Sequence, residues 1–137
     1  MVPTNVPLFV NGEGMRGGAV HHTIAAHPFL GHARTAPKYR FFSVGDRFPA
    51  LWHVDHGGVS VPGELYDVPL TTIRDQFIPA EPAELELGVV ELADGESALA
   101  VVLLHEVPDL RTAAGGVMIV GASMWETLAA RPREAAA

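Results

Sequence analysis

Glycine and proline interrupt this sequence so often that every regular element has to be short. The 137 residues include 14 Gly and 11 Pro. Proline ends or bends a helix and is excluded from the interior of most strands, and paired turn residues such as Asp94-Gly95 reverse the chain. The segments between these interruptions have the patterns of short strands and short helices.

Several segments have the character of strands. Asn11-Gly12 ends the first of them, and Gly57-Gly58 and Asp94-Gly95 are expected to form hairpin turns between later ones. The apolar run 98–104 does not alternate, which predicts a last strand buried on both faces. The predicted strands cover residues 6–10, 38–44, 51–54, 59–61, 64–68, 85–92 and 97–106.

Three short helices are expected beside these strands. The first lies within residues 19–27 and is closed by Pro28, and the second covers residues 70–77 between Pro69 and Pro79. A capping-box pattern, Ser123 followed by Glu126, opens the third, which is expected to run to about residue 130.

Six or more strands and three short helices, without strand–helix–strand alternation after residue 45, predict an α+β fold. We expect a small mixed, largely antiparallel β-barrel with flanking short helices. No linker or internal repeat divides the chain, so residues 1–130 are interpreted as a single domain and residues 131–137 as a frayed C-terminal tail.

The composition excludes several classes of site and partner. There is no cysteine, which rules out a disulfide scaffold, a cysteine-ligated metal and a thiol nucleophile. The net charge of −7 argues against nucleic acid as a partner. The longest apolar run is too short to span a membrane, and the N-terminal residues do not resemble a targeting segment, so a cytoplasmic protein without a membrane partner is expected.

Charge is distributed unevenly along the chain. Residues 1–50 carry a net charge of +3 and residues 51–137 carry −10. One interpretation is chance placement on a solvated surface, and this is the one that we favour. The other is that the first third lines a site for a small anion.

A glycine-rich segment follows the first predicted strand. Gly12, Gly14 and Gly17 spell G-x-G-x-x-G, as in dinucleotide-binding loops, but residues 30–40 contain no acid that could hold a ribose, and no Gly-Lys-Ser/Thr follows. No cofactor is therefore expected. The loop is interpreted either as a nest of backbone N–H groups for an anion or carbonyl oxygen, or as a tight turn without a ligand.

Histidine and glutamate supply the candidate acid–base groups. Six of the seven histidines lie between His21 and His56, without the spacing of a zinc-binding helix, so no metal is expected and a single general base, His21 or His22, is favoured. Glu81 lies between Pro79 and Pro82, at a rigid corner beside apolar residues. A carboxyl held there would have a raised pKa, suited to a general acid or base.

Several segments together resemble the gamma-glutamylcyclotransferase-like superfamily, and most closely the C-terminal domain of allophanate hydrolases. The resemblance covers roughly residues 8–106 and implies a small mixed barrel with flanking helices. The segments that carry it are LFVNGEGM, GHARTAPKYRFFSV, VPGELYDVP, FIPAEP and LGVVELADG.

The resemblance also implies site residues. In the cyclotransferases a loop after the first strand binds the substrate with its backbone. Its positions look like Asn11, Gly12, Glu13 and Gly14, of which only Gly12 matches the family pattern. The family's catalytic glutamate falls near Glu81. The further residues that the resemblance brings to the site are Met15, Arg16, Arg34 and Tyr39.

The function expected from this resemblance is a hydrolase or transferase that acts on a small amide, carbamoyl or carboxyurea-type compound by proton transfer. Glu81 would move the proton, His21 would assist, and the loop 11–16 would bind the substrate or an anion. The serine–serine–lysine machinery of an amidase is absent from the sequence. The alternative is a non-catalytic accessory or metabolite-binding subunit of an amidase. A homodimer is a further possibility.

Overall fold

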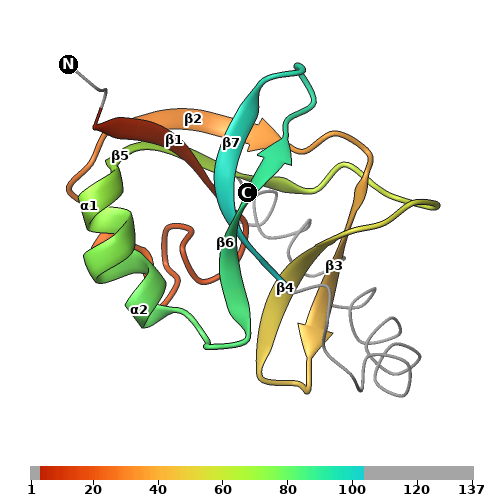
Figure 1. Cartoon of the computed structure of the whole chain (residues 1–137), viewed down its shortest axis with the longest axis horizontal. Coiled ribbons are helices and arrows are strands. Elements are labelled where there is room, and N and C mark those ends of the chain that lie inside the picture. The colour runs from red at the N-terminus through yellow and green to blue at the C-terminus, as the bar shows by residue number, and fades with distance from the viewer. Residues whose placement is uncertain (1–3, 104–137) are drawn as a thin grey trace, which may run out of the picture.

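The computed structural model of the chain describes residues 4–103, and Figure 1 shows their arrangement. Seven strands form one mixed sheet that curls into a half-barrel. The strands are β1 (Asn5–Val10), β2 (Phe29–Arg34), β3 (Tyr39–Val44), β4 (Phe48–His53), β5 (Pro62–Pro69), β6 (Leu85–Glu91) and β7 (Ser97–Leu103). Their order is β2-β5-β1-β7-β4-β3, and β6 also pairs with β7.

The sheet is largely antiparallel, as the sequence predicts, but its centre is parallel. β1 is antiparallel to β5 along its whole length, and β6 is antiparallel to β7. β1 and β4 both run parallel to β7. Both faces of β7 are covered, because Ala98 and Ala100 belong to the cluster inside the half-barrel and Leu99 and Val101 pack against the cluster on the helix side, which explains why its apolar run does not alternate.

Within residues 4–103, one continuous helix packs beside the sheet, and Figure 1 shows it next to β5 and β1. It runs through α1 (Leu70–Thr72), a π-helical segment (Ile73–Phe77) and α2 (Ile78–Ala80). The predicted helix is present, but it does not end before Pro79. The wider π turn ends at Phe77, two residues before this proline, which has no N–H to give to a helical hydrogen bond.

The buried side chains form two main clusters on opposite faces of β1. Phe9 packs inside the half-barrel with Phe41 and Leu51. Leu8 and Val10 point to the other face, where helix residues including Ile73 and Phe77 cover them. Alternate residues of one strand therefore serve both clusters, as the period of two requires.

Two local predictions are wrong. Residues 19–27 contain a 3₁₀ turn, His21–Thr23, and not an α-helix, because the N–H groups of Thr23, Ile24 and His27 donate to carbonyls three residues earlier and not four. The hairpin around Gly57-Gly58 does not form either. β4 pairs with β3 and with β7, so neither of its edges is free for residues 59–61.

The hairpin that does form joins β3 to β4. Its turn contains Gly45 and Asp46, which have φ of 55° and 57°. Two successive residues with positive φ match the twist of a hairpin, and this order of Gly and Asp is a weaker signal than Asp-Gly. The predicted hairpin at Asp94-Gly95 is confirmed, with Gly95 at φ 89° and the Asp94 carboxylate accepting from the Glu96 N–H at 2.9 Å.

Some predictions fall outside the described part of the chain. They are the end of the last strand at residues 104–106, the helix opened by Ser123 and the tail 131–137. The single domain 1–130 stays a prediction for the same reason. Within residues 4–103, no helix is long and apolar enough to cross a membrane.

Candidate functional site

The pairing of β7 leaves a split in the sheet. β6 occupies one edge of β7 from Ser97 to Leu103. On the other edge β1 pairs at Leu99, through Leu8, and β4 pairs farther along at Val102, through Leu51. The two strands therefore separate between these points, at the carboxyl end of β1.

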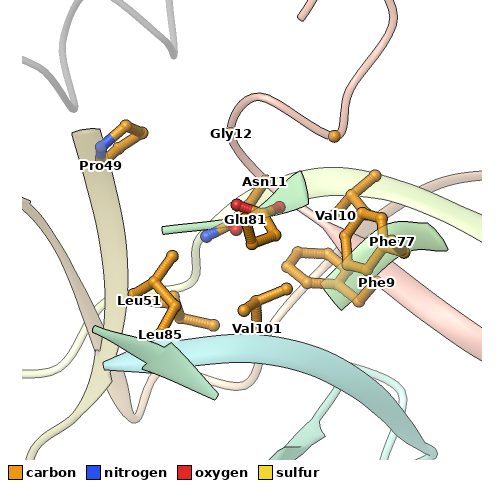
Figure 2. Close-up of a pocket in the computed structure, with 11 residues that line it drawn as sticks. Phe9, Val10, Asn11, Gly12, Pro49, Leu51, Phe77, Glu81, Leu85 and Val101 are labelled. Carbon is orange, nitrogen blue, oxygen red and sulfur yellow. The ribbon is translucent and has the colours of Figure 1, made fainter. Parts of the chain in front are cut away.

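A pocket lies at this split, and Figure 2 shows its lining. It encloses about 310 Å³ of space, including the part open to solvent. β1 and the loop after it form one side, β4 and β7 contribute apolar side chains, and the end of the helix closes it. The lining residues are Phe9, Val10, Asn11, Gly12, Gly14, Pro49, Leu51, Phe77, Glu81, Leu85 and Val101.

Glu81 is the titratable group of this lining. It follows α2 directly, and its extended backbone (φ −85°, ψ 157°) turns the chain from the helix toward β6. Its N–H donates to the Ile78 carbonyl at 3.1 Å, which fixes the corner. Burial, and secondly the nearby Glu13 carboxylate, raise the pKa of Glu81 to about 7. A carboxyl with this pKa can both accept and donate a proton near neutral pH.

Asn11 contributes a hydrogen-bond donor to the same pocket. It is the first residue after β1, and its side chain lies with Glu81 at the centre of Figure 2. Its Nδ2 is buried and has no hydrogen-bond partner among residues 4–103. A buried amide without a partner is costly in a folded protein, so this group is available for a ligand oxygen.

The glycine loop adds backbone donors. Among residues 4–103, no acceptor receives a hydrogen bond from the N–H groups of Gly12, Glu13 or Gly14, whereas Met15 donates to the Gly12 carbonyl at 3.0 Å. Glycine is required at Gly14, where a Cβ would lie 2.9 Å from the Val10 side chain. Successive free N–H groups of this kind bind anions and developing oxyanions.

The pocket brings together four of the predicted site residues: Asn11, Gly12, Gly14 and Glu81. Glu13 does not line it, but its carboxylate accepts from the Ala19 N–H at 2.8 Å and acts on Glu81 through its charge. Met15 packs against the core on the helix side of the sheet. The Arg16 guanidinium lies over the Phe29 ring, 4.0 Å from its centroid.

The other three predicted residues lie elsewhere. Arg34 is exposed and donates to the Ser60 carbonyl at 2.9 Å. Tyr39 is buried inside the half-barrel, where its hydroxyl accepts from the Glu91 N–H at 2.9 Å. His21 lies behind the loop, and its Nδ1 bonds the Gly14 carbonyl at 2.9 Å. None of these side chains belongs to the lining of the pocket, so the structure does not place them at the site.

The sequence did not single out the apolar walls of the pocket or Glu64. Glu64 is 4% exposed and accepts hydrogen bonds from the Arg16 N–H and the Tyr66 hydroxyl. The signal that would have found it is its strand position. Glu64, Tyr66 and Val68 alternate onto one face, and an acid on an apolar face needs partners there.

Potential metal ligands are scattered in the described part of the chain. Within residues 4–103, no three His, Asp or Glu side chains come close enough together to hold an ion. The predicted histidines are instead spread over several segments, and His22 bonds the Ala19 carbonyl at 3.0 Å.

Glu81 should also make the stability of the protein depend on pH. Below about pH 4.5 its carboxyl is protonated in the folded and the unfolded chain. Between pH 4.5 and about 7 the unfolded chain loses this proton while the folded protein keeps it, so stability falls as the pH rises, and the loss is complete above pH 7. We expect urea unfolding at several pH values to show this decline, on the order of 1–3 kcal/mol, in the wild type but not in Glu81→Gln. Parallel curves for the two proteins would contradict it.

Comparison with known proteins identifies the family. The model of the allophanate hydrolase C-terminal domain matches residues 6–114. No curated protein matches significantly. Among solved structures, a uropathogenic E. coli-specific protein is 34% identical with a TM-score of 0.68, over 75% of this chain and 82% of that one.

Two further structures are similar to this chain. Kluyveromyces lactis allophanate hydrolase is 29% identical with a TM-score of 0.65, over 74% of this chain but only 17% of that much longer enzyme. An AIG2-like protein from Mus musculus is 22% identical with a TM-score of 0.61, over 78% of this chain and 82% of that one, which shows a shared fold alone. The chain belongs to the allophanate hydrolase C-terminal domain family, with the gamma-glutamylcyclotransferase-like fold.

Proposed function

We propose that the pocket binds a small amide, carbamoyl or carboxyurea-type compound and that Glu81 transfers a proton to or from it. The observation that carries this proposal is the presence in one pocket of a carboxyl with a pKa of about 7 and of the buried Asn11 amide, a donor that no acceptor in the described part of the chain satisfies. An amide or carbamoyl group offers an oxygen to the donor and an N–H to the carboxyl, so it complements both.

In this reaction the loop and Glu81 have separate tasks. Asn11 and the N–H groups of Gly12 and Gly14 hold the carbonyl oxygen and stabilise the negative charge that develops on it. Glu81, in its ionised form, takes a proton from the attacking nitrogen or water and returns it to the leaving nitrogen. The apolar side chains of Phe9, Leu51 and Phe77 limit the access of water to Glu81, which keeps its pKa high.

The test is a substrate panel with the full chain. The protein is incubated with acetamide, urea, biuret, allophanate and a gamma-glutamyl amide, and products are followed by NMR. We expect one compound to be converted, at a rate that rises with pH around 7 because the ionised carboxyl is the base. The proposal fails if no compound is converted and none shifts the amide signals of Gly12 and Gly14.

The second candidate function is a non-catalytic subunit that binds a metabolite for an amidase. Its support is the likeness to one part of Kluyveromyces lactis allophanate hydrolase, in which this chain corresponds to only 17% of the enzyme. The same panel separates the two functions. Binding without conversion, together with capture of an amidase whose activity changes when this chain is added, would favour the subunit.

A further inference from the structure

Behind the glycine loop, and outside the pocket, lies a buried carboxyl. Glu64 is in β5, opposite Val10, the last residue of β1, and its side chain is 4% exposed. Its Oε1 accepts two hydrogen bonds, from the Arg16 N–H at 2.9 Å and from the Tyr66 hydroxyl at 2.9 Å. Burial, and secondly this bond to Glu64, raise the pKa of the Tyr66 hydroxyl, so it stays a donor.

The loop has two parts that differ in hydrogen bonding. The N–H groups of residues 12–14 have no acceptor within residues 4–103, but the next two N–H groups, of Met15 and Arg16, and the carbonyls of Gly14 and Met15 are all bonded. The Gly14 carbonyl accepts from His21, the Met15 N–H donates to Gly12, and the Met15 carbonyl accepts from Gly18. The Arg16 N–H donates to Glu64, which connects this part of the loop to strand β5 of the sheet.

The side chains around Glu64 form a packed support. The His21 and Tyr66 rings lie 5.5 Å apart, and Tyr66 also packs on Phe29, with 5.3 Å between centroids. His21 must carry its proton on Nδ1, because the Gly14 carbonyl can only accept. The loop is thus held by Glu64 through the Arg16 N–H and by His21 through the Gly14 carbonyl. Both side chains contact Tyr66, Glu64 by a hydrogen bond and His21 by ring packing.

We propose that Glu64, oriented by Tyr66, is a positioning residue that fixes the glycine loop from behind, so that the N–H groups of Gly12 and Gly14 stay at the wall of the pocket. The proposal rests on the pocket being the binding site. It assigns His21 to this support and not to the chemistry, because its Nδ1 is already bonded to the loop.

The test compares three variants of the full chain. Glu64→Met removes the acceptor at similar volume, Glu64→Gln keeps an oxygen at the same place, and Tyr66→Phe removes the orienting hydroxyl. Thr35→Val is the matched control, because Thr35 is equally buried and its Oγ1 accepts from the Val61 N–H at 2.9 Å, away from the loop.

Two NMR measurements show the position of the loop. Amide exchange of Arg16 should become about tenfold faster in Glu64→Met, the equilibrium factor of one typical hydrogen bond, and stay near the wild-type rate in Glu64→Gln. The titration midpoint of Glu81 should fall from about 7 toward 4.5 in Glu64→Met, because a displaced loop admits water and takes Glu13 away. In Tyr66→Phe, both the Arg16 exchange rate and the Glu81 midpoint should lie between those of the wild type and those of Glu64→Met.

The control separates positioning from general destabilisation. Thr35→Val should change the free energy of unfolding but neither the Arg16 exchange rate nor the Glu81 midpoint. The proposal is overturned if Glu64→Met leaves both quantities at their wild-type values, or if Thr35→Val changes them equally.

A third readout distinguishes this proposal from the proposed function. Acetamide is titrated into each protein, and the Gly12 and Gly14 signals are followed. If acetamide and every other compound of the panel fail to bind the wild type, the proposed function fails, while the exchange and titration results still decide whether Glu64 holds the loop. If acetamide binds, Glu64→Met should weaken its binding and Glu64→Gln should restore it.

Discussion

Replacing Glu81 with Gln should lower turnover of the amide, carbamoyl or carboxyurea-type substrate by about 10²–10⁴-fold, the usual contribution of a general acid–base group. Gln has nearly the same shape and can occupy the same corner between the helix and β6, but it cannot exchange a proton near neutral pH. The expected result is therefore a loss in kcat with an intact fold. The measurement is steady-state kinetics on whichever compound the panel shows to be converted.

The control for this variant is Glu84→Gln, three residues along the same corner. Glu84 is paired with Arg47 at 2.9 Å on the surface, which lowers the pKa of its carboxyl, and it does not line the pocket. Its replacement should leave turnover unchanged. If Glu81→Gln retains wild-type kcat, Glu81 has no part in the chemistry. If both variants lose activity equally, the effect is not specific to the pocket.

Replacing Phe77 with Ala should destabilise the protein by about 3–5 kcal/mol and also change the chemistry of the pocket. Phe77 is fully buried in the helix-side cluster, and it lines the pocket beside Glu81. Removing the ring leaves a cavity and admits water to the carboxyl. The titration midpoint of Glu81 should therefore fall from about 7 toward 4.5, since burial is the largest cause of its raised pKa.

Ile73→Ala is the matched control for this second effect. Ile73 lies one helical turn earlier in the same cluster, is 1% exposed and does not line the pocket. It should cost about 2–5 kcal/mol but leave the Glu81 midpoint near 7. Phe77→Leu keeps the fold measurable if the Ala variant unfolds, and should give a smaller shift in the same direction. An unchanged midpoint in both Phe77 variants would show that this ring does not bury Glu81.

Strand positions were predictable because they depend on local pattern. The strands found as β1, β3, β5, β6 and β7 lie where alternation or apolar runs predicted them. Glu81 was also predictable as a candidate, because the prolines at residues 79 and 82 mark a rigid corner without knowledge of its neighbours. The mixed, largely antiparallel sheet followed from the count of strands and the scarcity of helices.

The failures occurred where one segment competes with another. Residues 19–27 have helical spacing, but Glu13 bonds the N–H groups of Ala19 and Val20, and the chain then continues in turns with bonds to carbonyls three residues earlier. Residues 51–61 have a good hairpin turn, but β3 and β7 already occupy both edges of β4. Arg34 and Tyr39 lie in a segment that resembles the family closely, yet their side chains are directed to Ser60 and to the Glu91 backbone.

The sequence by itself determined where the strands lie, which loop follows β1, and that a carboxyl stands at the corner after the helix, because each of these depends on neighbouring residues. Only the tertiary structure decided that this loop and this carboxyl meet in one pocket. The pocket exists because β1 and β4, about 40 residues apart, pair with different parts of one edge of β7 and separate between them. The raised pKa of Glu81 and the burial of the Asn11 amide and of Glu64 follow from that packing. Burial and hydrogen bonding are set by contacts between distant segments, which local pattern does not encode.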